Sequence, residues 1–139
     1  MSFYESADQL YHTLETLFAR VREENPDAGE AILAGRLITR MRIIQPAAEV
    51  TMNARRRPLH ITYGPSSLRP DVEVEMLGDT LHRILLDELS MKKAAATGLL
   101  KVRGPAWKTF ALADLFHESQ ALYPQVLADP GLPNPAPIE

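Results

Sequence analysis

Residues 75–104 read EMLGDTLHRILLDELSMKKAAATGLLKVRG, and this stretch decides the fold. The residues that lead into it alternate apolar and charged side chains, which is typical of a strand with one buried face. Leucine and isoleucine then recur every three or four positions, so a helix is predicted from Gly78 to Leu89. A shorter helix over residues 91–96 ends before Gly98, and the alternation returns over residues 100–103. The stretch therefore predicts a strand, two helices and a second strand.

Upstream of this stretch, apolar residues recur at every second position in three further segments. These segments cover residues 39–43, 50–54 and 59–63, and a fourth strand at 72–76 runs into the quoted stretch. The connections between the first three are a few residues long, which favours an antiparallel meander with one buried face. The chain therefore contains five predicted strands.

Helices are predicted before the first strand and after the last strand in the sequence. Residues 3–24 show an amphipathic helical pattern, and a short second helix follows over residues 26–35. The last helix opens after the Gly-Pro pair at 104–105 and extends toward residue 123. A sheet with one charged face must cover its other face. We therefore expect an α+β fold in which helices cover one face of a five-stranded, largely antiparallel or mixed sheet.

Composition limits the domain organisation and the chemistry. A chain of 139 residues is the size of one domain, which we place at residues 1–128, and the proline-rich residues 129–139 are expected to form a flexible tail. The sequence contains no cysteine, which excludes disulfides, thiolate metal sites and thiol catalysis. Acidic residues stand near the N-terminus where a signal peptide would carry basic ones, so a cytoplasmic location is expected.

Positive charge is concentrated in one part of the chain. Residues 36–69 contain seven arginines and one glutamate, although the whole chain has a net charge of −3. The simplest interpretation is a solvated sheet face. The alternative is contact with an anionic head group or with an anionic membrane surface through Arg55, Arg56 and Arg57. Nucleic acid is not expected, because the band has few aromatic residues for base stacking.

Catalytic motifs are absent from the sequence. The four histidines show no metal-ligand spacing, and there is no nucleophile elbow, phosphate loop or dinucleotide fingerprint. His82 is the most interesting candidate, because Asp79 and Glu88 are close to it in sequence, but its helical position suggests a margin rather than a site. We therefore expect no catalytic residue, no cofactor and no bound metal.

The quoted stretch resembles the signature region of the sterol carrier protein type-two domain family. The resemblance rests on Lys93-Ala94, on Gly98, and on the Leu-Lys-Val-Arg-Gly run at 100–104, which occur in the family's order without a gap. It covers about thirty residues closely, over 75–104. It implies a five-stranded sheet covered by helices, and between the layers a hydrophobic tunnel that binds sterols, fatty acids or fatty acyl-CoA.

If the resemblance holds, flexible apolar side chains of the interior, such as those of methionine, are candidates for the tunnel wall. Methionine adapts its shape to variable apolar ligands, although core filling alone would also explain its use here. The candidates are Leu14, Phe18, Met41, Met52, Ile84, Leu85, Met91, Ala95, Trp107, Phe110, Ala111 and Phe116. The chain departs from the family at Ala95 and Ala96, where many members carry bulky aromatic residues. Small residues there either widen the cavity or leave space that Phe116 fills.

The favoured function is therefore binding of a hydrophobic small molecule, with transfer as a further step. The ligand class includes lipids, sterol-like molecules, fatty acyl groups and apolar biosynthetic intermediates. One alternative is an enzyme that uses the same cavity for an acid- or base-assisted cyclisation or isomerisation. Another is a protein-interaction module, for which a homodimer is the simplest arrangement.

Overall fold

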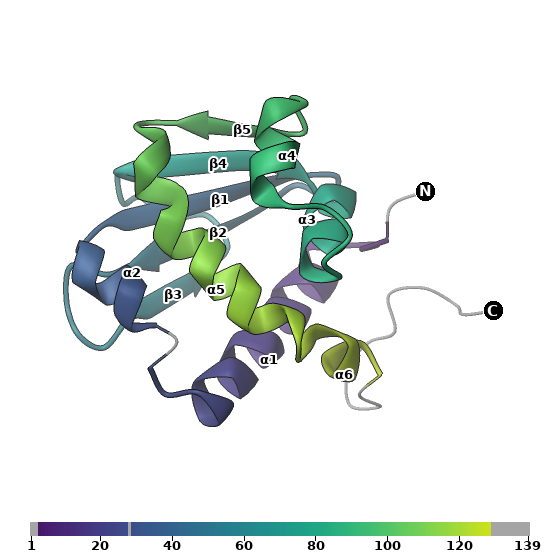
Figure 1. The fold of residues 1–139 in the computed structure, drawn as a ribbon, viewed down its shortest axis with the longest axis horizontal. Helices are drawn as coiled ribbons and strands as arrows, with labels where there is room; N and C mark the ends of the chain where they lie inside the picture. Colours follow the sequence, from purple (N-terminus) through teal and green to yellow (C-terminus); the bar gives the residue numbers. More distant parts are fainter. Residues whose placement is uncertain (1–2, 28, 129–139) are drawn as a thin grey trace.

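The computed structural model describes residues 3–27 and 29–128, and its strands form one mixed sheet (Figure 1). The elements in chain order are α1 (Ala7–Glu24), α2 (Glu30–Gly35), β1 (Ile38–Ile44), β2 (Ala48–Asn53), β3 (His60–Tyr63), β4 (Val72–Leu77), α3 (Gly78–Leu85), α4 (Met91–Ala96), β5 (Leu100–Arg103), the 3₁₀ turn η1 (Ala106–Thr109), α5 (Phe110–Gln120) and α6 (Tyr123–Leu127). The predicted α+β fold is confirmed.

The sheet has the strand order β3-β2-β1-β4-β5. β1 pairs antiparallel with β2 and parallel with β4, while β3 and β5 form antiparallel edges. The predicted meander of three strands is therefore correct, and the parallel β1–β4 pair makes the sheet mixed. The short edge strand β3 has four residues, and none of them is fully buried.

Helices cover one face of the sheet, and the core lies between the two layers. Figure 1 shows α5 crossing this face diagonally, from the tip of β5 toward α1 and α6. Apolar side chains of the central strands point into the core, and Met41, Val50 and Val74 are at most 1% exposed. Leu14 and Leu17 of α1 are completely buried against them. The alternation of apolar and polar residues therefore predicted correctly which strand side chains face the core.

The opposite face is less open than the charge pattern suggested. Arg40 lies on this face but is 8% exposed, because the connection between β3 and β4 covers it. Its guanidinium donates hydrogen bonds to the carbonyl oxygens of Ser66 (3.1 Å) and Leu68, and to the Thr51 hydroxyl (3.3 Å). Arg42 is exposed and forms an ion pair with Glu73 at 3.5 Å. Part of the arginine band is therefore structural.

Several helix boundaries differ from the sequence prediction. α2 begins at Glu30 instead of residue 26. α1 begins at Ala7, because the Ser6 hydroxyl accepts a hydrogen bond from the Gln9 amide at 3.1 Å and caps the helix there. α3 ends at Leu85 instead of residue 89, and Asp87 has a left-handed φ of 64°. The expected last helix is divided into η1, α5 and α6.

The predicted tail at 129–139 lies outside the described residues. Within the described ranges, no helix has both the length and the apolar character needed to cross a membrane.

Candidate functional site

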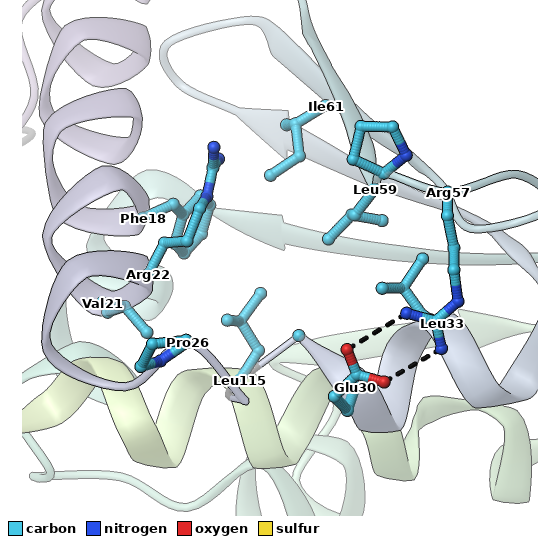
Figure 2. Close-up of a pocket in the computed structure, with 12 residues that line it drawn as sticks. Phe18, Val21, Arg22, Pro26, Glu30, Leu33, Arg57, Leu59, Ile61 and Leu115 are labelled. Carbon is cyan, nitrogen blue, oxygen red and sulfur yellow. Dashed lines mark hydrogen bonds and ion pairs between the residues drawn. The ribbon is translucent and has the colours of Figure 1, made fainter.

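A pocket of about 440 Å³ lies at the β3 end of the helical layer (Figure 2). Its walls come from α1, α2, α5, β3 and the connection that precedes β3. Most of the lining side chains are apolar, and these are Phe18, Val21, Pro26, Leu33, Pro58, Leu59, Ile61 and Leu115. The pocket is therefore an apolar chamber between the edge of the sheet and three helices.

Short elements border this space. α2 has six residues and β3 has four. Gly29 is the N-cap residue of α2 and lines the pocket without a side chain, and the nearest side-chain atom to a Cβ built there is Leu59 Cδ2 at 3.8 Å. A short helix, a short edge strand and a glycine therefore lie together at the pocket wall.

Charged groups stand at the rim of the pocket. The Arg57 guanidinium and the Glu30 carboxylate form two parallel hydrogen bonds, Nη1–Oε2 at 3.2 Å and Nη2–Oε1 at 3.0 Å (Figure 2). This pairing lowers the pKa of Glu30 and raises the pKa of Arg57. Arg22 of α1 also lines the pocket, from the wall opposite α2 (Figure 2). The site thus combines an apolar interior with guanidinium groups at its edge.

The structure distributes the predicted tunnel residues among several environments. Phe18 lines the pocket. Core residues that lie outside the pocket lining and are at most 1% exposed are Leu14, Met41, Met52, Ile84, Leu85 and Phe116. Met91 and Ala111 are partly buried against the core. Ala95, Trp107 and Phe110 are exposed, Trp107 by 61% and Phe110 by 68%. The assignment of all these candidates to a ligand tunnel stays a prediction.

The sequence indicated part of this site without identifying it. Leu59 and Ile61 follow the period-two pattern and were expected to point inward, as they do. What the pattern could not show is that β3 is the edge strand, where an inward residue meets a helix end instead of a packed layer. Arg57 was expected in an exposed turn, but its pairing with Glu30 joins residues 27 positions apart.

A second polar cluster lies at the other end of the helical layer. His82 Nδ1 is 2.7 Å from the Tyr123 hydroxyl, which also hydrogen bonds to the Tyr4 hydroxyl. The Phe3 ring stacks on His82 with centroids 3.5 Å apart. Burial is the main cause that lowers the pKa of His82 and raises the pKa values of Tyr4 and Tyr123. These groups are not among the residues that line the pocket.

The pocket offers little acid–base chemistry. Its carboxylate, Glu30, has a lowered pKa and is held by Arg57, so it is not tuned to exchange a proton near neutral pH. No group of three histidine, aspartate or glutamate residues is positioned to hold a metal ion in the part of the chain that the structure describes. The pocket lining therefore supplies apolar surface and one carboxylate that is paired with a guanidinium.

Comparison with known structures identifies the fold class. The chain has the fold of sterol carrier protein 2 domains. It superposes on sterol carrier protein domain 2 of Helicoverpa armigera with a TM-score of 0.63 and 17% identity, covering 81% of this chain and 89% of that chain. No protein-family model matches the chain, and no curated protein matches its sequence.

Two further structures are similar over most of their length. Palmitated SCP2L2 from Aedes aegypti gives a TM-score of 0.57 and 19% identity, covering 76% of this chain and 91% of that chain. The ubiquinone synthesis protein UbiJ-SCP2 gives 0.56 and 14% identity, covering 88% of this chain and 94% of that chain. The expected resemblance is therefore confirmed at the level of the fold.

Proposed function

We propose that this protein binds a lipid-like amphiphile in the pocket between α1, α2, α5 and β3. The pocket of about 440 Å³ carries this proposal, because it has apolar walls and charged groups at its rim. Small-molecule sites are typically clefts of about 300–1,000 Å³, mostly apolar, with a few polar groups that orient the ligand. Both the size and the lining of this pocket agree with that description.

The charges at the rim suggest how the ligand is oriented. An acyl or other hydrocarbon chain would lie against Phe18, Leu59 and Ile61. An anionic head group would lie at the rim beside Arg57, since a guanidinium binds a carboxylate through two parallel hydrogen bonds. Glu30 occupies that position of Arg57 in the structure, so an anionic ligand would compete with Glu30.

The comparisons support a lipid-like ligand without naming one. One similar structure is described as palmitated, and another belongs to a protein of ubiquinone synthesis. Both descriptions involve long hydrocarbon groups. This proposal has four further parts. They are transfer of the bound molecule between membranes, action in the cytoplasm, a homodimer, and a single domain over residues 1–128.

A filled pocket tests the proposal. Ile61→Trp places an indole in the chamber from a strand, where aromatic residues are well tolerated. We expect delipidated protein with this change to lose at least about tenfold in affinity for palmitate, measured by titration calorimetry. An apolar pocket cannot hold both an indole and an acyl chain.

Ile44→Trp is the matched control. Ile44 lies at the end of β1, is 42% exposed and does not line the pocket. We expect it to leave palmitate affinity within about twofold, and both variants to unfold in urea at concentrations near that of the unaltered protein. Equal palmitate affinity in folded Ile61→Trp and in the unaltered protein would contradict a ligand site in this pocket.

A further inference from the structure

Three connections meet at the end of the sheet where β1 and β4 begin. The Arg55 guanidinium donates a hydrogen bond to Asp71 Oδ1 at 2.7 Å, which joins the turn after β2 to the start of β4. A Cβ built on Gly104 would lie 3.1 Å from the Asp71 carbonyl oxygen, so the end of β5 packs against the same segment. Figure 1 shows η1 and the start of α5 at this end, beside the tip of β5. The three connections therefore form one continuous surface.

Two large aromatic residues are exposed on this surface. Trp107 is 61% and Phe110 is 68% exposed, whereas the other exposed large apolar residues that the structure describes are between 36% and 42% exposed. Trp107 lies in the 3₁₀ turn η1, and Phe110 follows it by three residues at the start of α5. Residues three apart in a 3₁₀ turn lie on one face. The chain therefore presents an indole and a phenyl ring side by side to solvent.

Basic side chains lie at the same end of the molecule as these rings. Lys108 Nζ lies 5.7 Å from the centroid of the Trp107 ring. The arginines that line a shallow hollow at the same end are Arg36, Arg55, Arg56 and Arg57. Two acids pair with these bases, Asp71 with Arg55 and Glu30 with Arg57. The pKa of Asp71 is lowered by the Ile38 amide and by Arg55, with a smaller effect of Lys108. Bases outnumber acids on this surface, so it attracts anions.

We propose that this end of the molecule, which we call the Trp107 face, docks onto an anionic membrane surface. We define it by Arg55, Arg56, Trp107, Lys108 and Phe110. Tryptophan is favoured at the level of the lipid head groups because its ring is apolar and its N–H is polar. Juxtamembrane basic residues contribute about 1 kcal/mol each on a negatively charged leaflet. Interleaved rings and bases are therefore suited to a bilayer with anionic lipids.

The position of the face relative to the pocket gives docking a consequence. Arg57 continues the basic turn of the Trp107 face and also lies at the pocket rim. A docked molecule would therefore hold the pocket close to the bilayer surface. Docking itself does not require an occupied pocket, so the two proposals can fail separately.

The single tryptophan makes insertion directly measurable. Vesicles of phosphatidylcholine with 30 mol% phosphatidylglycerol should shift Trp107 emission to shorter wavelength and protect it from acrylamide. Pure phosphatidylcholine vesicles should do so weakly, and 0.5 M NaCl should release the protein, because surface charges are screened. Absence of a shift and of co-flotation with the anionic vesicles would overturn the proposal.

Paired variants separate the two contributions to docking. Trp107→Ser with Phe110→Ser, and Arg55→Ser with Arg56→Ser, should each weaken co-flotation by on the order of tenfold or more. Leu77→Ser with Leu99→Ser removes two residues that are 40% and 39% exposed around a different hollow, and it should change co-flotation little. Lys92→Ser with Lys93→Ser on α4 controls for net charge.

Two other readouts decide what occupies the face. Palmitate affinity should be unchanged in Arg55→Ser with Arg56→Ser, because neither residue lines the pocket. Equal losses of co-flotation in the test and control pairs would overturn the assignment of this face. So would a dimer in sedimentation analysis that dissociates when Trp107 and Phe110 are replaced, because the face would then bind a second copy of the chain.

Discussion

The two ends of the helical layer are built differently although they cover the same sheet. At one end, Tyr4 and Tyr123 are 1% and 0% exposed, and their hydroxyl groups hydrogen bond to each other in the interior. At the other end, Leu59 and Ile61 are half-buried beside a chamber of about 440 Å³. We refer to these as the packed end and the hollow end. The difference shows that the pocket is a local feature and not a sign of a loose core.

Polar groups explain why one end closes and the other does not. At the packed end, His82 and the two tyrosines satisfy one another, so burial leaves no hydrogen-bonding group without a partner. At the hollow end, Glu30 and Arg57 pair at the rim and remain in contact with water. An exposed ion pair contributes little to stability and does not draw the layer closed. The packed end therefore supports the fold, while the hollow end leaves the space that the proposed ligand would occupy.

The largest expected effect separates the two ends by stability. Tyr123→Ala should lower the free energy of unfolding by about 3–5 kcal/mol, the range for truncation of a buried aromatic side chain. Leu59→Ala should cost clearly less than this, because Leu59 is half-buried and borders space that is already empty. Urea denaturation of both variants measures the difference.

Tyr123→Phe distinguishes hydrogen bonding from packing within this prediction. It keeps the ring but leaves the Tyr4 hydroxyl and His82 without their shared partner, which should cost about 1–3 kcal/mol. Similar costs for Leu59→Ala and Tyr123→Ala would show that the two ends do not differ in packing, and the comparison would fail.

Local patterns in the sequence predicted most of the fold. Alternation over residues 72–76 and 100–103 marked strands correctly, because each has one buried face. The packed end could not be predicted in this way, since Tyr4 and Tyr123 are 119 residues apart and no local pattern relates them. The helix cap at Ser6, which begins α1 after Tyr4, was also missed.

The exposure of Trp107 and Phe110, two of the candidate tunnel residues, has a simple geometric cause. The structure has a 3₁₀ turn over Ala106–Thr109, with three residues per turn instead of 3.6. The two rings stay together but are exposed, on a different side from the buried Leu112 and Leu115. A 3₁₀ segment at a helix start is not distinguishable from an α-helix by apolar spacing alone.

The packed end should respond to pH through His82. Its pKa is lowered from the ordinary value of 6.5, mainly by burial, although Glu88 and Asp79 oppose this shift. The unfolded chain then binds a proton more readily than the folded chain does, so stability should fall as pH drops from above 6.5 through the lowered pKa. Unfolding midpoints in urea between pH 8 and pH 5 measure this loss.

His82→Gln should flatten that part of the pH profile while it lowers stability at pH 8. His117→Gln, at an exposed position of α5, should leave the profile unchanged. Glu30 and Asp71 have lowered pKa values, so their contributions are lost in a separate range, below their ordinary values of 4.5 and 3.8. An unchanged slope between pH 8 and pH 5 in His82→Gln would assign the pH response to other groups.

The smallest expected effect tests the rim of the hollow end. Glu30→Gln removes the carboxylate that pairs with Arg57, so Arg57 becomes available to the carboxylate of a fatty acid. Palmitate affinity should rise by about two- to fivefold, the range that an exposed ion pair spans, and the gain should shrink in 0.5 M NaCl. Affinity for hexadecanol, which lacks the charge, should not change.

Glu23→Gln makes the same change of net charge on α1 outside the pocket lining, and it should leave both affinities as they were. An equal gain in both variants would attribute the effect to overall charge. A loss of palmitate affinity in Glu30→Gln would instead mean that Glu30 holds Arg57 in position for the ligand, and the rim would then act as a preformed site rather than as an ion pair that the ligand must displace.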